Sequence, residues 1–343
     1  MPMSAVPGPP GQVSRSGPGQ LRWTAARLVG VFLSAAAVAV LVSSIDIRET
    51  GTYLMQANSA LLLLAGALVL LQLATVTLRW SFLLPAAHDG RAAWAGLLVP
   101  VSLGYLGNFV LPARLGELVR SGYASRRWRI PLAPTIGSVV LERVIDTAVL
   151  ASVALIAAIV LGSPAWIVQI AAVAAAAGAL VVFVLAGSLG LPIATWLQAR
   201  ESAPLARAGH VLGAFLVGAA PDRRTAIAPA ALLSAASWVL EGTVYWLVAT
   251  AVGLDPTLPE ALLVAAVTVL ATAIPAAPAY VGTFELAATA AAGSLGISPA
   301  AGLAWAVLAH LVTVAPLMAA GVFALVRTGV RMDELVGEAS PAE

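Results

Sequence analysis

The 343-residue chain contains neither cysteine nor lysine, and only 10% of its residues are charged. Without cysteine there is no disulfide, no thiolate nucleophile and no zinc–thiolate site. The three histidines, His88, His210 and His310, lie too far apart in the sequence to have metal-ligand spacing, and we expect no metal and no cofactor. Soluble domains carry roughly 25% charged residues. The scarcity of charge therefore excludes a soluble enzyme, a nucleic-acid-binding module and a disordered protein as the main identity.

Apolar residues take the place of the missing charge. They make up 60% of the chain, and the mean hydropathy is +0.96, whereas a soluble domain has roughly 45–50% apolar residues. A soluble chain of this length could not bury so much apolar surface. The composition predicts an all-α, polytopic helical membrane protein. Nucleic acid is not an expected partner, because the arginines follow the pattern of cytoplasmic loops in membrane proteins.

Nine apolar runs can be recognised along the chain, and a spanning helix needs about 20 apolar residues. Most of the runs are long enough. Two of them, 92–111 and 261–277, end in a motif marked by proline and glycine and are followed at once by polar residues. The run 286–297 is short for a full crossing. The complete set is 28–45, 59–78, 92–111, 136–161, 165–186, 226–254, 261–277, 286–297 and 300–326.

Arginines in short loops predict the orientation, because such loops stay on the cytoplasmic side. Three arginines precede the first run, which at 18 residues is longer than the core of a signal peptide, so we favour an uncleaved first helix. Five arginines between 114 and 129 follow the run 92–111 and would all lie outside if that run crossed fully. We therefore expect a re-entrant hairpin over about 92–112, a second over 261–297, and about six full crossings.

This topology places both termini on the cytoplasmic side of the cytoplasmic (inner) membrane. Residues 1–20 are rich in proline, glycine and serine, so they are expected to be a disordered arm. Residues 21–328 are expected to form a single transmembrane domain, and 329–343 a flexible acidic tail. The loops 46–58 and 187–225 are expected on the outer and the cytoplasmic side, respectively.

An internal repeat is suggested by two similar breaks. The motif from Pro112 to Glu117 has a counterpart from Pro278 to Glu285, and the two prolines are 166 residues apart. At that offset 59–161 aligns with 226–327, and the two copies face opposite ways in the expected topology. Inverted repeats with interrupted helices are the architecture of alternating-access carriers, in which the breaks mark the binding site. The alternative is a chance alignment of hydrophobic runs.

Two groups of charged residues follow the first break. Arg114, Glu117 and Arg120 have a spacing that places neighbours on one helical face, and a helix beginning near Pro112 would have free N–H groups that attract anions. Here an ordinary salt-bridged anchor at the membrane surface is the alternative to a site. The second group is Glu142, Arg143 and Asp146. It either neutralises itself or pairs with Arg114 or Arg120 to close a polar pocket.

Two further acids lie in the second half of the chain. An ionisable group at bilayer depth costs about 2.5–3.5 kcal/mol on insertion scales, so it needs a partner or a purpose. Glu241 has no basic neighbour within a helical turn, and we favour a role as proton carrier or headgroup ligand. Glu285 follows Tyr280 and Gly282, and His310 is its possible partner, although a lone histidine is more often a packing residue. Over these groups three arginines face five carboxylates, which favours a cationic or zwitterionic ligand.

The stretch GYLGNFVLPARLGELVR at 104–120 resembles the signature of the lysylphosphatidylglycerol synthase transmembrane-region family, a group of flippase-like membrane proteins. Glu142-Arg143-Val-Ile-Asp146 resembles the second motif of that family, and 275–285 resembles the third. The resemblance covers about residues 20–330. In the third motif, Ala276, Ala277, Ala279 and Tyr280 stand where the family commonly has glycine.

The resemblance implies an inner-membrane protein of lipid or lipid-linked sugar handling. The family's bifunctional members carry a soluble aminoacyl transferase domain, which this chain lacks, so lipid aminoacylation is not carried over. The expected substrate-binding residues are Asn108, Pro112, Arg114, Gly116, Glu117, Arg120, Glu142, Arg143, Asp146, Glu241, Tyr280, Gly282 and Glu285.

Three functions are compatible with these residues. The first is translocation of a membrane lipid with a zwitterionic or cationic headgroup. The second is an enzyme of lipid-linked glycosyl transfer, against which stands the lack of an Asp-x-Asp pair or a Ser/His/Asp set. The third is a membrane partner of a soluble transferase.

Overall fold

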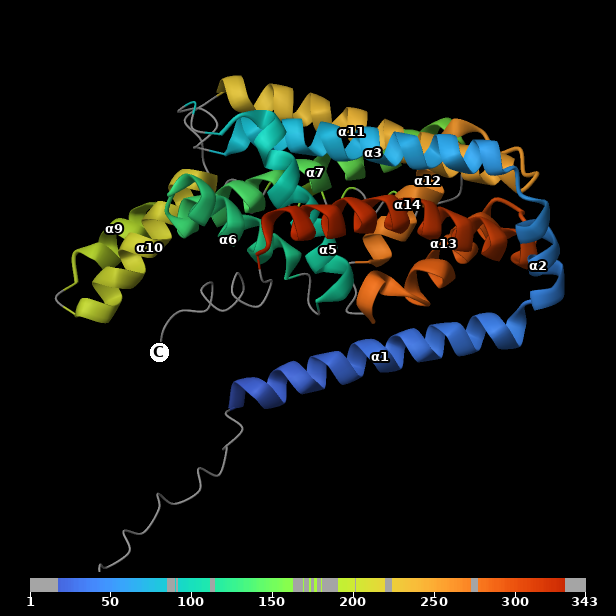
Figure 1. Cartoon of the computed structure of the whole chain (residues 1–343), viewed down its shortest axis with the longest axis horizontal. Helices are drawn as coiled ribbons and strands as arrows, with labels where there is room; N and C mark the ends of the chain where they lie inside the picture. Colours follow the sequence, from blue (N-terminus) through green and yellow to red (C-terminus); the bar gives the residue numbers. More distant parts are fainter. Residues whose placement is uncertain are drawn as a thin grey trace, which may run out of the picture.

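The structure is a computed structural model. It describes residues 18–84, 92–111, 115–162, 191–200, 202–219, 224–272 and 277–330, together with Gly90 and scattered positions between 169 and 180. Within these ranges every regular element is a helix, which confirms the all-α prediction (Figure 1). Residues 1–17 of the expected disordered arm and residues 331–343 of the expected acidic tail lie outside the described residues. The helix α1 begins at Pro18, which is inside the range expected for the arm.

The first part of the chain runs from α1 (Pro18–Ser44) through α2 (Ile47–Gln56) to α3 (Ser59–Leu83). Residues 46–58, expected as an outer loop, form α2 instead. Asp46 and Asn58 explain the correction, because each accepts two backbone N–H groups and so caps the helix that follows it. The axes of α1 and α2 differ by 93°, and α1 extends along one side of the bundle (Figure 1).

The remaining elements follow in the order given at the end of this paragraph. The segment 187–225 was expected to be a loop, but 191–198 and 203–219 form two helices, of which the second packs against α7. This pair projects from one end of the bundle (Figure 1). The elements are η1 (Trp94–Leu97), α5 (Leu98–Val110), α6 (Gly116–Trp128), α7 (Leu132–Val160), α9 (Leu191–Gln198), α10 (Ala203–Ala219), α11 (Arg224–Ala251), α12 (Leu258–Ala271), η4 (Pro278–Tyr280), α13 (Thr283–Ser294) and α14 (Pro299–Thr328).

Three described helices, α3, α11 and α14, are long and apolar enough to cross a membrane. The bent pair α1–α2 makes a fourth if it counts as one span. These helices support a multi-pass membrane protein. Six crossings stay a prediction, because most of the expected span 165–186 is outside the described residues.

Both expected hairpins have a helix on each side of a break. The first has its break between α5 and α6, and its return leg is the polar helix α6, so its helices extend over 94–128 rather than 92–112. The expectation was wrong in its end point because the return leg is polar and was not recognised as part of the hairpin. The second consists of α12 and α13 on either side of η4, and it begins at Leu258, three residues before the expected range 261–297.

The helix boundaries repeat at the offset of the two prolines. Adding 166 to the bounds of α3 gives 225–249, which lies inside α11, and adding it to α6 gives 282–294, the range of α13 within one residue. The same step takes α7 to 298–326, where α14 is found. Packing repeats as well, since α5 contacts α14 and its counterpart α12 contacts α7, while α3 packs against α11 at the centre.

The second break is held in a conformation that glycine favours. Ala279 and Tyr280 have φ angles of 54° and 62°, and Gly282 has 87°. A non-glycine residue held in this region costs on the order of 1–3 kcal/mol. Two of the four positions at which the family commonly has glycine thus have the backbone conformation that glycine adopts without strain.

Gly282 also sits against α1. A Cβ atom at this position would lie 2.6 Å from the Ser34 carbonyl oxygen, and the Ser34 hydroxyl accepts the Ala277 N–H at 2.9 Å. We predict that Gly282→Ala loosens the contact between α1 and the second break and lowers the free energy of unfolding by about 1–3 kcal/mol.

Thermal unfolding of the detergent-solubilised protein measures this effect. Gly253→Ala is the matched control, because its φ of 82° is similar but nothing lies within 4 Å of the added Cβ. The control therefore carries the backbone strain without the steric contact. Equal losses for the two variants would contradict the proposed close approach of α1.

Candidate functional site

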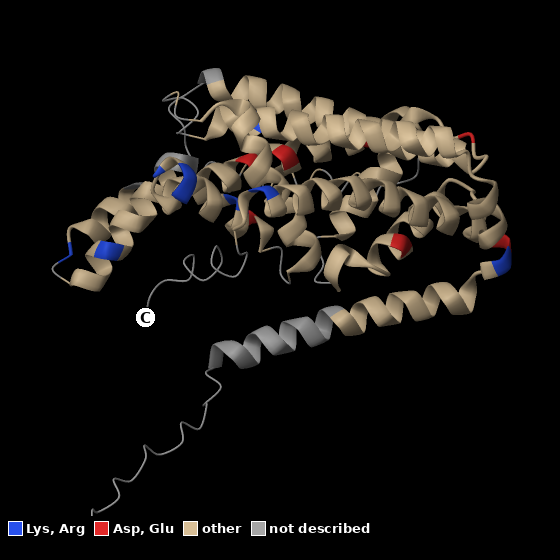
Figure 2. Ribbon diagram, in the orientation of Figure 1, with Lys and Arg blue, Asp and Glu red and all other residues tan. Residues whose placement is uncertain are grey.

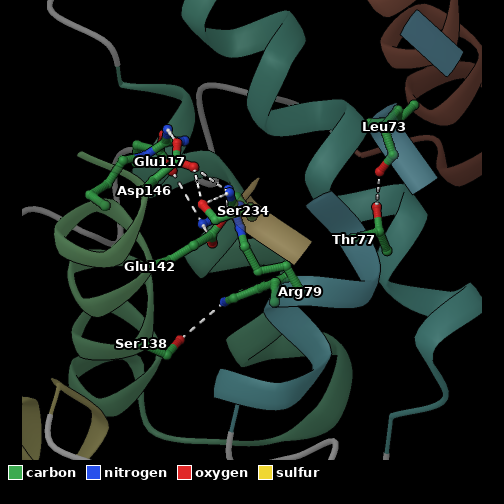
Figure 3. Close-up of polar contacts among 11 residues, drawn as sticks. Leu73, Thr77, Arg79, Glu117, Ser138, Glu142, Asp146 and Ser234 are labelled. Carbon is green, nitrogen blue, oxygen red and sulfur yellow. Dashed lines mark hydrogen bonds and ion pairs between the residues drawn. The ribbon is translucent and has the colours of Figure 1, made fainter. Parts of the chain in front are cut away.

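Charged residues occur along the middle of the bundle as well as at its ends (Figure 2), and several of them are buried. Arg79, near the end of α3, lies at the centre of the largest group and is 1% exposed. Its Nη2 donates to Glu142 Oε1 at 2.6 Å, and its Nη1 donates to the Ser234 hydroxyl at 2.8 Å and to Asp146. Glu142, Asp146 and Ser234 surround this guanidinium in Figure 3. Three helices, α3, α7 and α11, are thereby joined.

Glu142 bridges two arginines. Its second oxygen, Oε2, accepts from Arg120 Nη2 at 2.6 Å, and the carboxylate is completely buried. The Arg120 guanidinium also lies over the Trp80 ring, 4.5 Å from its centroid. Trp80 in turn donates its indole N–H to Ser138 at 3.1 Å. The pairing of Glu142 with Arg120 confirms one of the two partners expected for the second group of charges.

A more exposed ion pair lies at the edge of this group. Arg143 Nη2 and Glu117 Oε1 are 2.5 Å apart, and their side chains are 44% and 26% exposed. Glu117 is also 3.5 Å from Arg120, and Arg143 is 3.8 Å from Asp146, so the pair is continuous with the buried network.

The six charged residues of this network, three arginines and three acids, are called the polar cluster. Its positive and negative charges are equal in number, whereas the excess of acid predicted from the sequence also counted Glu241 and Glu285, which lie outside the cluster. Arg79, which the sequence analysis did not include among the site residues, supplies one of the three arginines. A self-neutralised cluster does not by itself require a charged ligand. Its members are Arg79, Arg120, Arg143, Glu117, Glu142 and Asp146.

The acid of the second break has the partner that the sequence suggested. Glu285 Oε1 is 2.5 Å from His310 Nδ1, and Glu285 Oε2 accepts the Gly282 N–H at 2.7 Å. The imidazole also stacks on Phe284, with 4.2 Å between the ring centroids. His310 is therefore the partner of Glu285 as well as a packing residue.

Glu241 is buried on α11, one turn before Tyr245. It is 6% exposed, and the Gln72 side chain of α3 lies within hydrogen-bonding reach. Gln72 also donates to the Ser237 carbonyl at 3.1 Å. Among the described residues no basic group forms an ion pair with Glu241, and the acid faces the Gln72 amide instead.

The other predicted residues have positioning roles or cannot be placed. Asn108 accepts the Gly116 N–H at 3.1 Å and so caps α6. Pro112 and Arg114 are outside the described residues. The Tyr280 carbonyl accepts the Thr283 hydroxyl at 3.0 Å, which places Tyr280 in the break before α13. Among the described residues no group of three or more histidines and acids is arranged to hold a metal ion.

Three residues of the site were not predicted as site residues. Arg79 and Trp80 continue the helix of the apolar run 59–78, and Ser234 lies inside the run 226–254. A signal for Arg79 was present, because an arginine directly after a run of 20 apolar residues sits within one turn of the hydrocarbon region. Ser234 gives no signal, since serines are common in membrane helices.

Comparison with known proteins gives two matches. The family described as "Lysylphosphatidylglycerol synthase TM region" matches residues 27–321. A curated protein of Haloferax volcanii, "Glycosyltransferase AglD", is 28% identical over 356 aligned positions, which cover 91% of this chain and 56% of that protein. The chain thus spans little more than half the length of this relative. Because the match extends over most of the chain and includes every residue of the polar cluster, the protein belongs to the lysylphosphatidylglycerol synthase transmembrane-region family.

Proposed function

We propose that this protein moves a phospholipid or a lipid-linked headgroup across the cytoplasmic membrane, with both of its termini on the cytoplasmic side. The observation that carries the proposal is the partly exposed Glu117–Arg143 pair at the edge of a buried, neutral cluster. An exposed ion pair contributes only about 0–1 kcal/mol, so it can open at little cost. The buried arginines behind it are tied to Glu142 and would stay in place.

An opened pair would offer both charges that a zwitterionic headgroup needs. The Arg143 guanidinium can bind a phosphate through two parallel N–H donors, while the Glu117 carboxylate can accept from an ammonium group. The polar cluster has no net charge, and neither does a zwitterionic headgroup. Such a headgroup can therefore replace the contact between Glu117 and Arg143 without leaving a net charge in the membrane. The repeated helix–break–helix units support the same function, since such units would supply alternating gates.

The test uses the purified protein in proteoliposomes that contain a phosphatidylethanolamine with a fluorescent label on one acyl chain, which leaves the zwitterionic headgroup intact. Dithionite quenches label in the outer leaflet, so the quenched fraction measures lipid exchange. We expect Glu117→Gln and Arg143→Gln each to lower the exchange rate by about tenfold, the equivalent of about 1.4 kcal/mol in headgroup binding. Arg143→Lys should retain part of the activity, because it keeps the charge but loses the two-pronged contact.

Exposed residues on α2 provide matched controls. Glu49→Gln and Arg48→Gln make the same chemical changes at positions remote from the cluster, and both should exchange lipid at the wild-type rate. Unchanged exchange in Glu117→Gln and Arg143→Gln would remove the polar cluster from the transport path.

A second candidate is a membrane component of lipid-linked glycosyl transfer, either as the enzyme itself or as the partner of a soluble transferase. The similarity to part of a protein named as a glycosyltransferase favours it. Incubation of the purified protein with nucleotide-sugar donors and a polyprenyl phosphate tests for the enzyme. Product formation without lipid exchange would favour this function over transport, as would co-purification of a stoichiometric soluble enzyme.

A further inference from the structure

The two halves of the chain place an acid–base pair at corresponding positions. Glu117 lies in the first turn of α6 and pairs with Arg143 on α7, 26 residues later. Glu285 lies in the first turn of α13 and pairs with His310 on α14, 25 residues later. The acids are 168 residues apart and the bases 167, close to the 166-residue offset of the helices. The pair thus recurs with one chemical change, from arginine, whose guanidinium is always charged, to histidine, a residue type that serves as acid, base and proton carrier in proteins.

The contacts of Glu285 connect the protonation of this pair to the second break. One carboxylate oxygen of Glu285 faces His310, and the other accepts a hydrogen bond from the Gly282 N–H. Gly282 is the last residue of the second break, in which three residues have positive φ angles. A proton on the imidazole converts a contact between a neutral ring and a carboxylate into an ion pair, which strengthens the attraction between the two side chains. Protonation of His310 therefore strengthens the contact that Glu285 makes between the second break and α14, and deprotonation weakens this contact.

The surroundings of the pair are poor in other charges. The titratable groups on the elements packed against α13 and α14 include three tyrosines, Tyr245 on α11, Tyr280 in η4 and Tyr105 on α5. Arg79 on α3 belongs to the polar cluster. Tyr245 is close enough to Glu285 to interact with it electrostatically. Glu241 lies one turn before Tyr245. The charged residues of α2 are exposed, and Glu260 of α12 is held in the capping box with Thr257.

Among the described residues, the ion pair of Glu285 is with His310. The side chains of both are largely shielded from solvent, with 13% and 9% exposed. A proton that binds here therefore changes the charge of a single pair. At the polar cluster, by contrast, the added charge would be shared among several connected ion pairs.

We infer that the Glu285–His310 pair is a proton-binding site that couples proton movement to transport. The inference rests on the proposed function, to which it adds the energy source. A proton from the aqueous phase on one side binds the imidazole, the break closes onto α14, and the same proton leaves to the other side when the gate opens. No bond other than the N–H bond forms or breaks, and charge is conserved between the two compartments.

The experiment compares wild type, His310→Gln, His310→Arg and His210→Gln in proteoliposomes with an imposed pH gradient. His210→Gln is the matched control, because His210 is exposed on α10. We expect a gradient to change the lipid exchange rate several-fold in wild type and in the control as the pH moves between about 6 and about 8, the range in which histidine titrates. Both His310 variants should still exchange lipid but should be indifferent to the gradient.

Direct proton binding separates this inference from the proposed function. The purified wild-type protein should take up about one more proton than His310→Gln between about pH 8 and about pH 5, whether or not lipid exchange is observed. Equal uptake, or a gradient response that survives in His310→Gln, would overturn the inference while leaving transport through the polar cluster standing. Loss of exchange in the Glu117→Gln variant alone would leave the proton site unaffected.

Discussion

Glu142→Gln is expected to destabilise the protein by about 3–5 kcal/mol, the usual cost of removing one partner from a buried ion pair. Glu142 is fully buried and accepts from Arg79 and Arg120 at 2.6 Å each. After the change, two buried guanidinium groups would lie close together without the carboxylate between them. The effect is measured as the change in thermal unfolding of the detergent-solubilised protein, with size-exclusion chromatography to detect aggregation.

Two further variants make the interpretation specific. Glu49→Gln changes an exposed acid of α2 and should leave the unfolding midpoint unchanged. A triple variant, Arg79→Met/Glu142→Leu/Arg120→Met, removes the bridged charges together and should be more stable than Glu142→Gln, because it leaves no buried guanidinium without a carboxylate, while Asp146 keeps Arg143 as a partner. If Glu142→Gln were as stable as the wild type, the carboxylate could not be the buried bridge between two arginines.

The sequence predicted the fold through its composition and its two breaks. Runs of apolar residues without charge leave little choice but membrane helices, and the spacing between Pro112 and Pro278 predicted the offset at which the helix boundaries repeat. The loops were predicted less well. Residues 46–58 and 187–225 carry helices because end caps and packing against neighbours, rather than hydrophobic length, determine them.

Part of the candidate site could be predicted from the sequence, and the rest could not, for a physical reason. Neighbouring charges on one helix can be paired by spacing alone, as with Glu117 and Arg120. Pairing between helices depends on how their faces meet, which one sequence does not show. Arg79 illustrates the limit: at the end of an apolar run it fits a loop anchor equally well, and only the packing of α3 against α7 and α11 places it beside Glu142.

The correspondence between the halves gives the polar residues different tasks. In the first half the acid of the break is paired with arginine and joined to a buried network, an arrangement suited to holding a polar headgroup. In the second half the acid is paired with His310 alone among the described residues, an arrangement suited to a gate that responds to protons. Glu241 lies on α11 of the second half and interacts with Gln72 on α3 of the first half, so this contact joins the two halves.

Gly116→Ala is the second change with a large expected effect. The helices α5 and α6 approach so closely that a Cβ atom on Gly116 would lie 1.9 Å from the Gly104 carbonyl oxygen and 2.6 Å from the Asn108 side-chain oxygen. Both obstacles belong to one short helix, and the first is backbone, which cannot rotate away. The hairpin must therefore separate, which also breaks the Asn108 cap on the Gly116 N–H.

We expect a loss of about 3 kcal/mol in unfolding free energy, the upper part of the range for inserting a methyl group into a packed core plus the loss of one cap. Gly51→Ala is the matched control: it lies within α2 with nothing within 4 Å of the added Cβ, so it should be neutral or stabilising by about 0.5–1 kcal/mol. Because α6 carries Glu117 and Arg120 to the polar cluster, lipid exchange should fall together with stability in Gly116→Ala. Wild-type stability in that variant would contradict the close approach of α5 and α6, and with it the arrangement that brings the first break to Glu142 and Arg143.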